Sequence, residues 1–373
     1  MRFCLLFSAV FATCAASGAA QSMTGSEALR LNQIQVIGTH NSYHAGIPPS
    51  EAQLWKQKDP AAFTWLDYQH KPLSEQLNGG VRQIELDIFA DSKGGLFADP
   101  AGPKAVAAAH LAADAPFDPA NIMRQPGFKV LHLQDVDYRS VCQPFTACLA
   151  EVRQWSKAHP GHAPIFILVE TKQDQPRPGV QFTTPEPFTV AVFNALDEAI
   201  RSVFAPAEMI TPDDVRGSYP TLNKAVLAGN WPTLQTARGK VVFLLDQQPA
   251  RTLYLEDHPG LRGRVLFTNS VAGADDAAFL ERNEGHVEEI RSLVEKGYLV
   301  RTRTDANTLE ARQNRVARRD ATLRSGAQLL STDYPPNEPA RWRGHYKVEF
   351  KSGQPVRCNV VNAPAGCTIE PGF

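Results

Sequence analysis

Short apolar runs that each end in polar or charged residues recur along most of this chain, between Leu31 and Pro335. Each run is rich in Val, Ile and Leu, and the segments between the runs include several with helical spacing of apolar residues. This alternation is typical of buried parallel strands joined by helices. The runs number eight, which is the number of strands that closes an α/β barrel. They are Ile34–Gly38, Gln83–Phe89, Lys129–Leu133, Ile165–Glu170, Lys240–Leu245, Arg264–Phe267, Tyr298–Thr302 and Gln328–Ser331.

We therefore expect an α/β fold, a (β/α)8 TIM-type barrel over residues 21–336. Residues 91–125 are rich in Ala, Gly and Pro and predict a long loop. After Pro336 the pattern changes, and Tyr346–Phe350 with a cysteine pair predicts a small disulfide-tied C-terminal hairpin over residues 337–373. The predicted helices are Thr146–Ala158, Pro187–Phe204, Ala274–Glu295 and Leu309–Ser325.

The N-terminus has the pattern of a secretory signal peptide over residues 1–20. Met1-Arg2 precede the apolar run Phe3–Ala16, and small residues close the segment before Gln21. The run is shorter than the roughly 18 residues that a transmembrane helix needs, and no later segment reaches that length. We therefore expect a secreted or periplasmic protein with no transmembrane segment.

Cysteine usage agrees with export. Two of the six cysteines lie in the predicted signal, and the other four form two close pairs. Four cysteines allow three pairings, and we favour the two local ones because each pair brackets a turn-rich stretch. A zinc site is the competing interpretation, but no C-x-x-C or nearby H-x-x-x-H completes it. The expected disulfides are Cys142–Cys148 and Cys358–Cys367.

Composition and missing motifs exclude several classes of function. The chain has 38 basic and 39 acidic residues, a formal charge of -1, so it lacks the basic surface of a nucleic-acid binder. It also lacks the nucleophile elbow of serine hydrolases, the H-E-x-x-H of zinc proteases and the glycine-rich loops of nucleotide enzymes. We expect a monomeric globular protein with no nucleic-acid partner.

Acidic residues at the strand ends predict a metal site, because catalytic groups of such barrels lie at the carboxyl ends of the strands. Glu85 and Asp87 are two residues apart, so they point to the same face of their strand. With Asn41 and Glu170 they form an all-oxygen set, which suits calcium or magnesium and not zinc. The alternative is that Glu85 and Asp87 form ion pairs with Arg82 or Arg301.

Two histidines at neighbouring strand ends are the candidate catalytic residues. His40 and His132 could flank one phosphate, one handling the proton of the nucleophile and the other that of the leaving group. His44 follows four residues after His40 in a predicted loop and has a weaker claim. Further polar residues at strand ends are candidates for substrate contacts: Lys172, Arg301, Arg303, Asp333 and Tyr334.

The motifs at these positions resemble the X-region of phosphoinositide-specific phospholipases C. The matching segments are Val36–Tyr43, Arg82–Asp87 and Leu131-His132, and the closest resemblance is to the secreted bacterial calcium-dependent group. In that family a His-Asn pair follows the first strand, Glu-x-Asp lies on the second, a second histidine follows on the third and a glutamate lies on the fourth. Here these positions are His40, Asn41, Glu85, Asp87, His132 and Glu170.

The resemblance implies a calcium cofactor, magnesium being the weaker choice, and cleavage of phosphatidylinositol-type lipids to diacylglycerol and a cyclic inositol phosphate. A transient contact with a membrane surface fits such a substrate. His132 lies in Leu-His-Leu and lacks the Gly-His-Thr setting of the larger enzymes. Lys172 resembles the lysine of glycerophosphodiester phosphodiesterases, which usually open with His-Arg where this chain has Asn41. A glycerophosphodiester or other phosphoric diester hydrolase is therefore the alternative, and a non-catalytic lipid or sugar receptor is a third.

Overall fold

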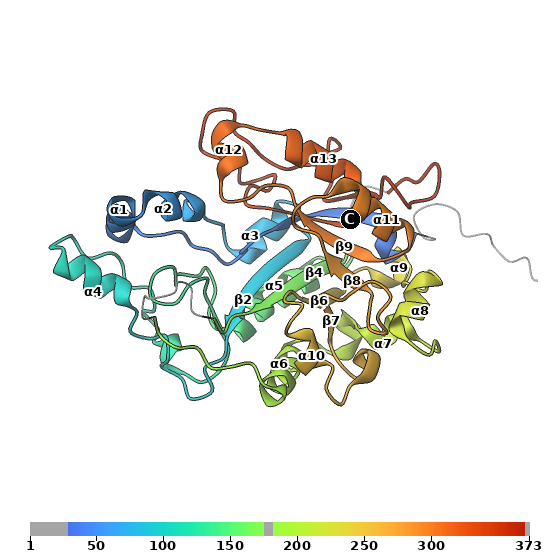
Figure 1. Ribbon diagram of the computed structural model, residues 1–373, viewed down its shortest axis with the longest axis horizontal. Coiled ribbons are helices and arrows are strands. Elements are labelled where there is room, and N and C mark those ends of the chain that lie inside the picture. The colour runs from blue at the N-terminus through green and yellow to red at the C-terminus, as the bar shows by residue number, and fades with distance from the viewer. Residues whose placement is uncertain (1–28, 175–181, 370–373) are drawn as a thin grey trace, which may run out of the picture.

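Eight parallel strands form the centre of the molecule, and helices lie around them (Figure 1). The computed structural model describes residues 29–174 and 182–369. The strand order is β7, β6, β4, β2, β1, β10, β9 and β8, and a parallel bridge from Asn269 to Phe279 connects the two ends. This is the predicted (β/α)8 arrangement. The strands are β1 (Ile34–Thr39), β2 (Gln83–Phe89), β4 (Ile165–Thr171), β6 (Val241–Leu245), β7 (Leu266–Thr268), β8 (Phe279–Glu281), β9 (Leu299–Arg303) and β10 (Leu329–Thr332).

The third predicted strand does not belong to this barrel. The sequence predicts a barrel strand at Lys129–Leu133, whereas β3 (Lys129–Val130) pairs antiparallel with the end of β2. The chain then turns, and a bridge between Leu133 and Asp137 closes a tight loop. This prediction is therefore wrong, and His132 lies on a loop beside β2. A further short strand, β5 (Met209–Ile210), pairs with the start of β6.

The remaining barrel strand lies in a segment that the sequence predicts as helix. The helix predicted over Ala274–Glu295 is wrong in its first half, because β8 pairs with β9 and helix α11 (Val287–Glu295) begins later. The run Phe279-Leu280 is too short to show a strand period, and the alanines before it favour a helix. Burial decides the outcome, since both side chains are fully buried in the barrel.

The outer helices follow from capping and apolar spacing. In α6 (Val190–Val203) the Thr189 hydroxyl accepts the N–H of Val192 at 3.3 Å, and Phe193, Leu196 and Ile200 form one buried face. Helices α5 and α6 confirm the first two predicted helices, and the last one divides into α12 and α13. The other helices are α1 (Pro49–Lys58), α2 (Pro60–Leu66), α3 (Leu73–Asn78), α4 (Ala101–Ala108), α5 (Phe145–Ala158), α7 (Pro212–Arg216), α8 (Leu222–Leu227), α9 (Leu234–Ala237), α10 (Arg251–Tyr254), α12 (Leu309–Gln313) and α13 (Ala317–Ser325).

Helices α1, α2 and α4 project to one side of the barrel, at the left of Figure 1. α4 lies within residues 91–125, so the prediction of a continuous loop there is wrong. The segment packs on a small apolar cluster separate from the main core, formed by Phe89, Phe97, Met123, Leu131 and Tyr138.

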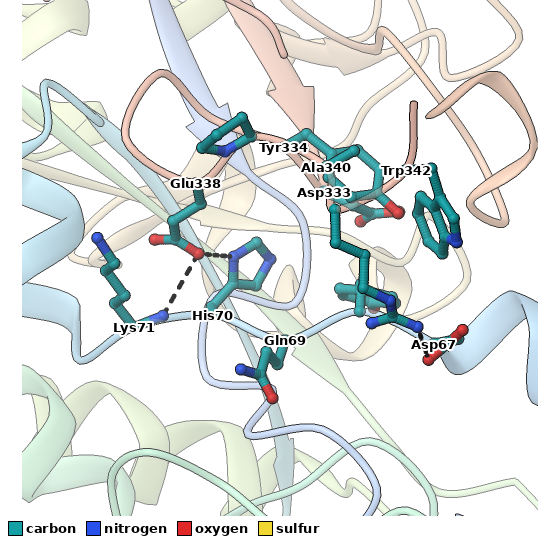
Figure 2. Close-up of a pocket in the computed structure, with 12 residues that line it drawn as sticks. Asp67, Gln69, His70, Lys71, Asp333, Tyr334, Glu338, Ala340 and Trp342 are labelled. Carbon is teal, nitrogen blue, oxygen red and sulfur yellow. Dashed lines mark hydrogen bonds and ion pairs between the residues drawn. The ribbon is translucent and has the colours of Figure 1, made fainter. Parts of the chain in front are cut away.

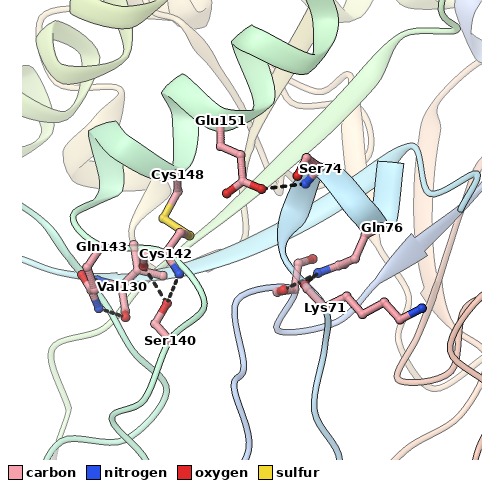
Figure 3. Close-up of a disulfide and its surroundings, with 10 residues drawn as sticks. Lys71, Ser74, Gln76, Val130, Ser140, Cys142, Gln143, Cys148 and Glu151 are labelled. Atoms are coloured by element: carbon pink, nitrogen blue, oxygen red, sulfur yellow. Dashed lines mark hydrogen bonds between the residues drawn. A yellow bond between two sulfur atoms is a disulfide. The ribbon is translucent and has the colours of Figure 1, made fainter. Parts of the chain in front are cut away.

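The first disulfide joins Cys142 to Cys148, which lies in the first turns of α5 (Figure 3). The loop before it is held by Ser140, whose hydroxyl donates to the carbonyl of Cys142 at 2.7 Å. The N–H of Val141 donates to the carbonyl of Tyr43 at 2.8 Å. The loop that carries His132 is therefore attached to the loop after β1.

The C-terminal segment is tied to the barrel by a strand and a disulfide. Cys358 is bonded to Cys367, as the sequence predicts. Tyr346–Phe350 is not a strand, and β11 (Val356–Cys358) pairs antiparallel with β1, so the segment extends the barrel sheet and does not form a hairpin of its own.

Two predictions on chain organisation concern the two ends of the chain. The predicted signal peptide, residues 1–20, lies outside the described residues. The division at residue 336 stays a prediction. Within residues 29–174 and 182–369, no helix has the length and hydropathy needed to cross a membrane.

Candidate active site

The carboxyl ends of the barrel strands bring most of the predicted site residues to one end of the barrel. The loop after β1, the strands β2, β4 and β9, and the end of β10 each contribute side chains, and hydrogen bonds or ion pairs connect them. The predicted residues in or directly after these strands are His40, Asn41, Glu85, Asp87, Glu170, Lys172, Arg301, Arg303 and Asp333.

The loop after β1 is joined to β2 by a pair of hydrogen bonds. The N–H of Ser42 donates to the carbonyl of Glu85 at 3.0 Å, and the Ser42 hydroxyl accepts the N–H of Glu85 at 2.8 Å. Asn41, just before, has a φ of +46°, a left-handed conformation that asparagine tolerates well. This turn ends β1 and holds Asn41 next to the carboxylates of β2.

The three predicted carboxylates form a cluster. Glu85, Asp87 and Glu170 each offer an oxygen, and these oxygens lie within 4.8 Å of one another. Both Asp87 oxygens and the Oδ1 of Asn41 are buried, and among the described residues none of the three has a hydrogen bond of good geometry, although Oδ2 of Asp87 lies within ion-pair distance of Lys172. Burial and then the charge of Glu170 raise the pKa of Asp87 well above its ordinary value. Buried oxygens without partners and an excess of negative charge suit a hard cation, so the residues fit a calcium site.

Two basic side chains share this cluster. Nζ of Lys172 lies 3.0 Å from Oε1 of Glu170 and 3.3 Å from Oδ2 of Asp87. Arg301 donates to Oε2 of Glu85, whereas Arg82 donates to backbone carbonyls of α3 and the residues after it. The ion pair between Glu85 and Arg301 that the sequence analysis left open is therefore present. Two cations facing three carboxylates still leave a negative charge.

His40 is paired with an aspartate from the neighbouring strand. Its Nδ1 lies 2.8 Å from Oδ1 of Asp333, and its Nε2 lies 3.0 Å from Nη1 of Arg303 and 3.7 Å from Oε1 of Glu85. Burial, followed by the charge of Arg303, lowers the pKa of His40 well below its ordinary value of 6.5. A neutral ring that donates from Nδ1 to Asp333 keeps its lone pair at Nε2, facing Arg303.

His132 is paired with an aspartate of its own loop, a residue that the sequence analysis did not single out. Its Nδ1 lies 2.8 Å from Oδ2 of Asp137, and Nε2 of His44 lies 2.9 Å from both oxygens of the same carboxylate. Burial opposes the charge on Asp137, but His44 and His132 outweigh it and hold the pKa of Asp137 well below its usual range. Burial lowers the pKa of His132. Asp137 thus fixes the orientation of His132 from behind.

A match to a known protein family identifies the family of this chain. The family described as phosphoinositide phospholipase C, Ca2+-dependent, matches residues 29–360, which is most of the chain. The chain belongs to this family. Its members are phosphoric diester hydrolases, which agrees with two histidines placed beside a carboxylate cluster. A search of curated proteins finds no match.

Solved structures support the fold of this phosphoinositide phospholipase C family member. A calcium-dependent phosphoinositol-specific phospholipase C from Pseudomonas sp. matches at a TM-score of 0.53 and 18% identity, over 90% of this chain and 96% of that chain. A myoinositol complex of the Pseudomonas enzyme matches at a TM-score of 0.52 and 18% identity, over 89% and 96%. The calcium-dependent enzyme of Streptomyces antibioticus has 20% identity and a TM-score of 0.49, over 83% and 97%.

In this phospholipase C family member the C-terminal segment is connected to the backbone of the loop after β1. Nε2 of His70 lies 3.0 Å from the carbonyl oxygen of His40, and Nδ1 of His70 lies 2.9 Å from Oε2 of Glu338 (Figure 2). Glu338 also accepts the N–H of Lys71 at 3.4 Å. His70 therefore connects His40 to the segment after β10.

The same segment supports Asp333. Asp305 accepts the N–H of Asp333 at 3.0 Å and the hydroxyl of Tyr346 at 3.3 Å. Burial and then Asp333 raise the pKa of Asp305 to about 6. Tyr334, a predicted substrate contact, lines a cavity of about 320 Å³ together with Asp333, His70 and Trp342 (Figure 2). Asp333 also lines the cavity of His40, His132 and Arg303, whereas Tyr334 does not.

Proposed function

We propose that this family member is exported and cleaves phosphatidylinositol-type lipids, releasing diacylglycerol and a cyclic inositol phosphate. The observation that carries the proposal is one cluster of buried, partly unpartnered carboxylates flanked by two histidine–aspartate pairs. A transient contact with a membrane surface accompanies a lipid substrate of this kind.

Asn41, Glu85, Asp87 and Glu170 are the residues that would hold calcium. A bound ion would lower the pKa of the attacking inositol hydroxyl, whose proton would pass to His40 or to a carboxylate of the set as its oxygen bonds to phosphorus, and would neutralise charge on a phosphate oxygen. Lys172 lies on an oxygen of Glu170 and Arg301 on an oxygen of Glu85, so each places a positive charge beside the cluster. For Glu170 burial acts the other way, but Lys172 outweighs it and lowers the pKa of that carboxyl.

His40 and Arg303 form the phosphate side of the site. Nη1 of Arg303 lies 3.0 Å from Nε2 of His40, so an anionic phosphodiester oxygen beside this pair meets the positive charge of Arg303, and His40 donates to it once Nε2 carries a proton. Asp333 holds both groups, since it lies 3.2 Å from Nη2 of Arg303. Loss of His40 should therefore affect every substrate.

His132 is the proposed general acid for the glycerol oxygen. Asp137 accepts a hydrogen bond from Nδ1–H and stabilises the imidazolium, which leaves Nε2 to donate a proton to the departing alkoxide. The His132 side chain is 19% exposed, whereas that of Asp137 is 1% exposed. The ring is therefore accessible, and the aspartate behind it is shielded from water.

Phosphorus NMR of the products tests the proposal. Phosphatidylinositol and glycerophosphoinositol should each yield a cyclic inositol phosphate in the presence of calcium, and neither should react in excess chelator. The glycerophosphodiester alternative, which Lys172 favours through its position on Glu170, predicts a phosphomonoester from glycerophosphoinositol and little turnover of the lipid. Full turnover in excess chelator would contradict the proposed calcium site.

The variants Asp87→Asn and Glu85→Gln test the metal ligands. Each removes one charge from an all-oxygen site, so most of the calcium-supported activity and calcium affinity should disappear. Asp320→Asn on α13 is the matched control, because this aspartate lies on the helix surface and pairs with Arg319. Unchanged calcium affinity in Asp87→Asn would contradict the assignment.

Export is tested separately, by the N-terminal sequence of the protein recovered from outside the cytoplasm. A mature chain that begins near Gln21 is the expected result. An intact Met1 on the exported protein would contradict the proposed signal peptide.

A further inference from the structure

An apolar cavity of about 650 Å³ opens beside the two catalytic histidines. His40, His132, Arg303 and Asp333 lie on one side of it. The opposite walls come from α1, α2 and α4, the helices that project from the barrel in Figure 1. Side chains that make these walls apolar include Leu54, Trp55, Trp65, Leu66, Leu133 and Phe182.

Hydrogen bonds attach helices α1 and α2, which form two of these walls, to other segments of the chain. The cavity is therefore part of the fold. The carboxylate of Asp114 accepts the N–H groups of Ser50 and Glu51 at 3.0 and 3.1 Å, which fixes the start of α1. At the end of α2 the Thr308 hydroxyl donates to the carbonyl of Thr64 at 2.7 Å.

Helix α4 approaches α1 closely through a glycine. A Cβ placed on Gly102 would lie 2.3 Å from Oε2 of Glu51, which means that a larger residue would push the two helices apart. Glu51 is buried and accepts the hydroxyl of Tyr138. Cavities with mostly apolar walls and a few polar groups usually bind a ligand whose apolar part is buried, while the polar groups fix its orientation.

The chemistry of the neighbouring groups identifies the ligand. In the proposed reaction the phosphate lies at His40 and Arg303, and the glycerol oxygen lies at His132. Leu133 and Val136, which follow His132 in the same loop, line the cavity. The group on the leaving side of the phosphate therefore faces the apolar walls. Trp65, which also lines the cavity, is 50% exposed.

We propose that this cavity binds the diacylglycerol part of one lipid molecule, namely the glycerol backbone and the first carbons of its acyl chains. This inference rests on the proposed function and specifies which part of the substrate the α1, α2 and α4 walls recognise. A cavity of about 650 Å³ has the size that drug-sized ligands fill, so it can take the start of the chains and not their full length.

Filling the cavity tests the proposal. Ala105 on α4 and Ala62 on α2 line it, whereas Ala108 lies on the same helix as Ala105, is exposed and does not line it. The readout is the ratio of kcat/KM for monomeric dihexanoyl-phosphatidylinositol to that for glycerophosphoinositol, which has no chains. The ratio should exceed 10 in the wild-type enzyme, fall about tenfold in Ala105→Trp and Ala62→Phe, and stay unchanged in Ala108→Trp.

Several results would overturn the proposal. A wild-type ratio near 1 would do so, and so would an unchanged ratio in two filled variants that keep the wild-type melting temperature. If the filled variants slow cleavage of lipid in vesicles but not of the monomeric lipid, this face contacts a membrane surface and is no binding pocket.

A binding measurement separates this proposal from the proposed function. Monomeric dihexanoylglycerol should change the tryptophan fluorescence of the wild-type protein and of Ala108→Trp, and Ala105→Trp should weaken that binding about tenfold. If the wild-type enzyme cleaves no inositol phosphodiester, the proposed function fails while the binding result still decides the role of the cavity. Equal affinity of all three proteins for dihexanoylglycerol would contradict the proposed role of the cavity.

Discussion

The two histidine–aspartate pairs are built in different ways. His40 and Asp333 are 293 residues apart in sequence and meet because β1 and β10 are neighbours in the barrel. His132 and Asp137 are five residues apart in one loop. The first pair therefore depends on the closed barrel, whereas the second depends on local loop structure that the Cys142–Cys148 disulfide borders.

Their surroundings differ as well. Arg303 lies on the free nitrogen of His40, and its positive charge adds to the effect of burial on the pKa of His40. For His132 burial lowers the pKa, while Asp137 opposes this effect. Both rings lie on an aspartate through Nδ1, so the difference between them lies at Nε2, where a guanidinium contacts His40. The proposed roles, His40 at phosphorus and His132 at the leaving oxygen, depend on that difference.

The most severe change should be Asp333→Asn. It leaves Arg303 without its carboxylate and puts an amide beside Nδ1 of His40, which can donate to that nitrogen and so favour the other tautomer of the ring; we therefore expect kcat/KM to fall on the order of 10²–10⁴-fold on every substrate. Steady-state kinetics on phosphatidylinositol and on an activated nitrophenyl ester measure this loss. A fall of less than tenfold, with Asp320→Asn as the unaffected control, would show that the long-range pair is dispensable.

The buried His162 sharpens the comparison, because its ring contacts are with Ser156 and a backbone carbonyl and not with a carboxylate. His162 accepts from the Ser156 hydroxyl at 2.7 Å and donates to the carbonyl of Ala163 at 2.6 Å, and burial lowers its pKa to about 4. Between pH 6.5 and about 4 the unfolded chain binds the extra proton, so the free energy of unfolding should fall by up to about 3 kcal/mol as the pH decreases through this window.

Urea unfolding of His162→Gln at pH 7 and pH 4.5 measures this contribution. The variant should lose that part of the pH dependence, and His110→Gln, on an exposed residue, should keep it. Identical pH dependence in both variants would contradict the assignment of His162 as a buried neutral ring.

Asp137→Asn should have a smaller effect on activity than Asp333→Asn. The local loop keeps His132 in place through the Val141–Tyr43 hydrogen bond, so the loss should be about 10–100-fold on phosphatidylinositol and less on the nitrophenyl ester. The comparison of the two substrates in one variant is the measurement. A larger loss on the activated ester than on the lipid would contradict a role for Asp137 in proton donation.

The smallest effect on activity should come from the disulfides. Removing Cys142–Cys148 by serine substitution should cost about 2–3 kcal/mol of stability and reduce activity a few-fold, since it loosens the loop of His132. Removing Cys358–Cys367 should cost a similar free energy. Thermal melts measure the loss of stability in the two double variants, and steady-state kinetics measure their loss of activity. A greater activity loss in the Cys358–Cys367 variant would contradict the expected ranking.

The site residues that could be predicted from the sequence are those that lie in or next to a run of apolar residues typical of a strand. His40, Glu85 and Asp87 follow or lie within strongly apolar runs, so their position at the strand ends could be inferred. Asp137 could not be assigned in this way, because it lies in an irregular loop whose path depends on the contacts to His44 and Tyr43. The only sequence feature that could have pointed to Asp137 is its position five residues after His132.

The missed features of the fold have physical causes of the same kind. β8 has three residues, and its strand form depends on pairing with β9 and not on local propensity. β3 was predicted as a barrel strand because its apolar run resembles the others, but Asp137 and Leu133 close a loop there. The supporting roles of Asp305 and His70 depend on contacts with the C-terminal segment, which no local pattern predicts.

Leaving-group dependence tests the central claim most directly, namely that His40 acts at phosphorus and His132 at the leaving oxygen. The measurement is kcat/KM of His40→Ala and His132→Ala on phosphatidylinositol and on nitrophenyl inositol phosphate, whose leaving group departs without a proton. His40→Ala should lose activity about equally on both substrates, whereas His132→Ala should lose much less on the nitrophenyl ester. Equal losses on both substrates for His132→Ala would contradict its role as general acid, and normal rates for both variants would contradict the account as a whole.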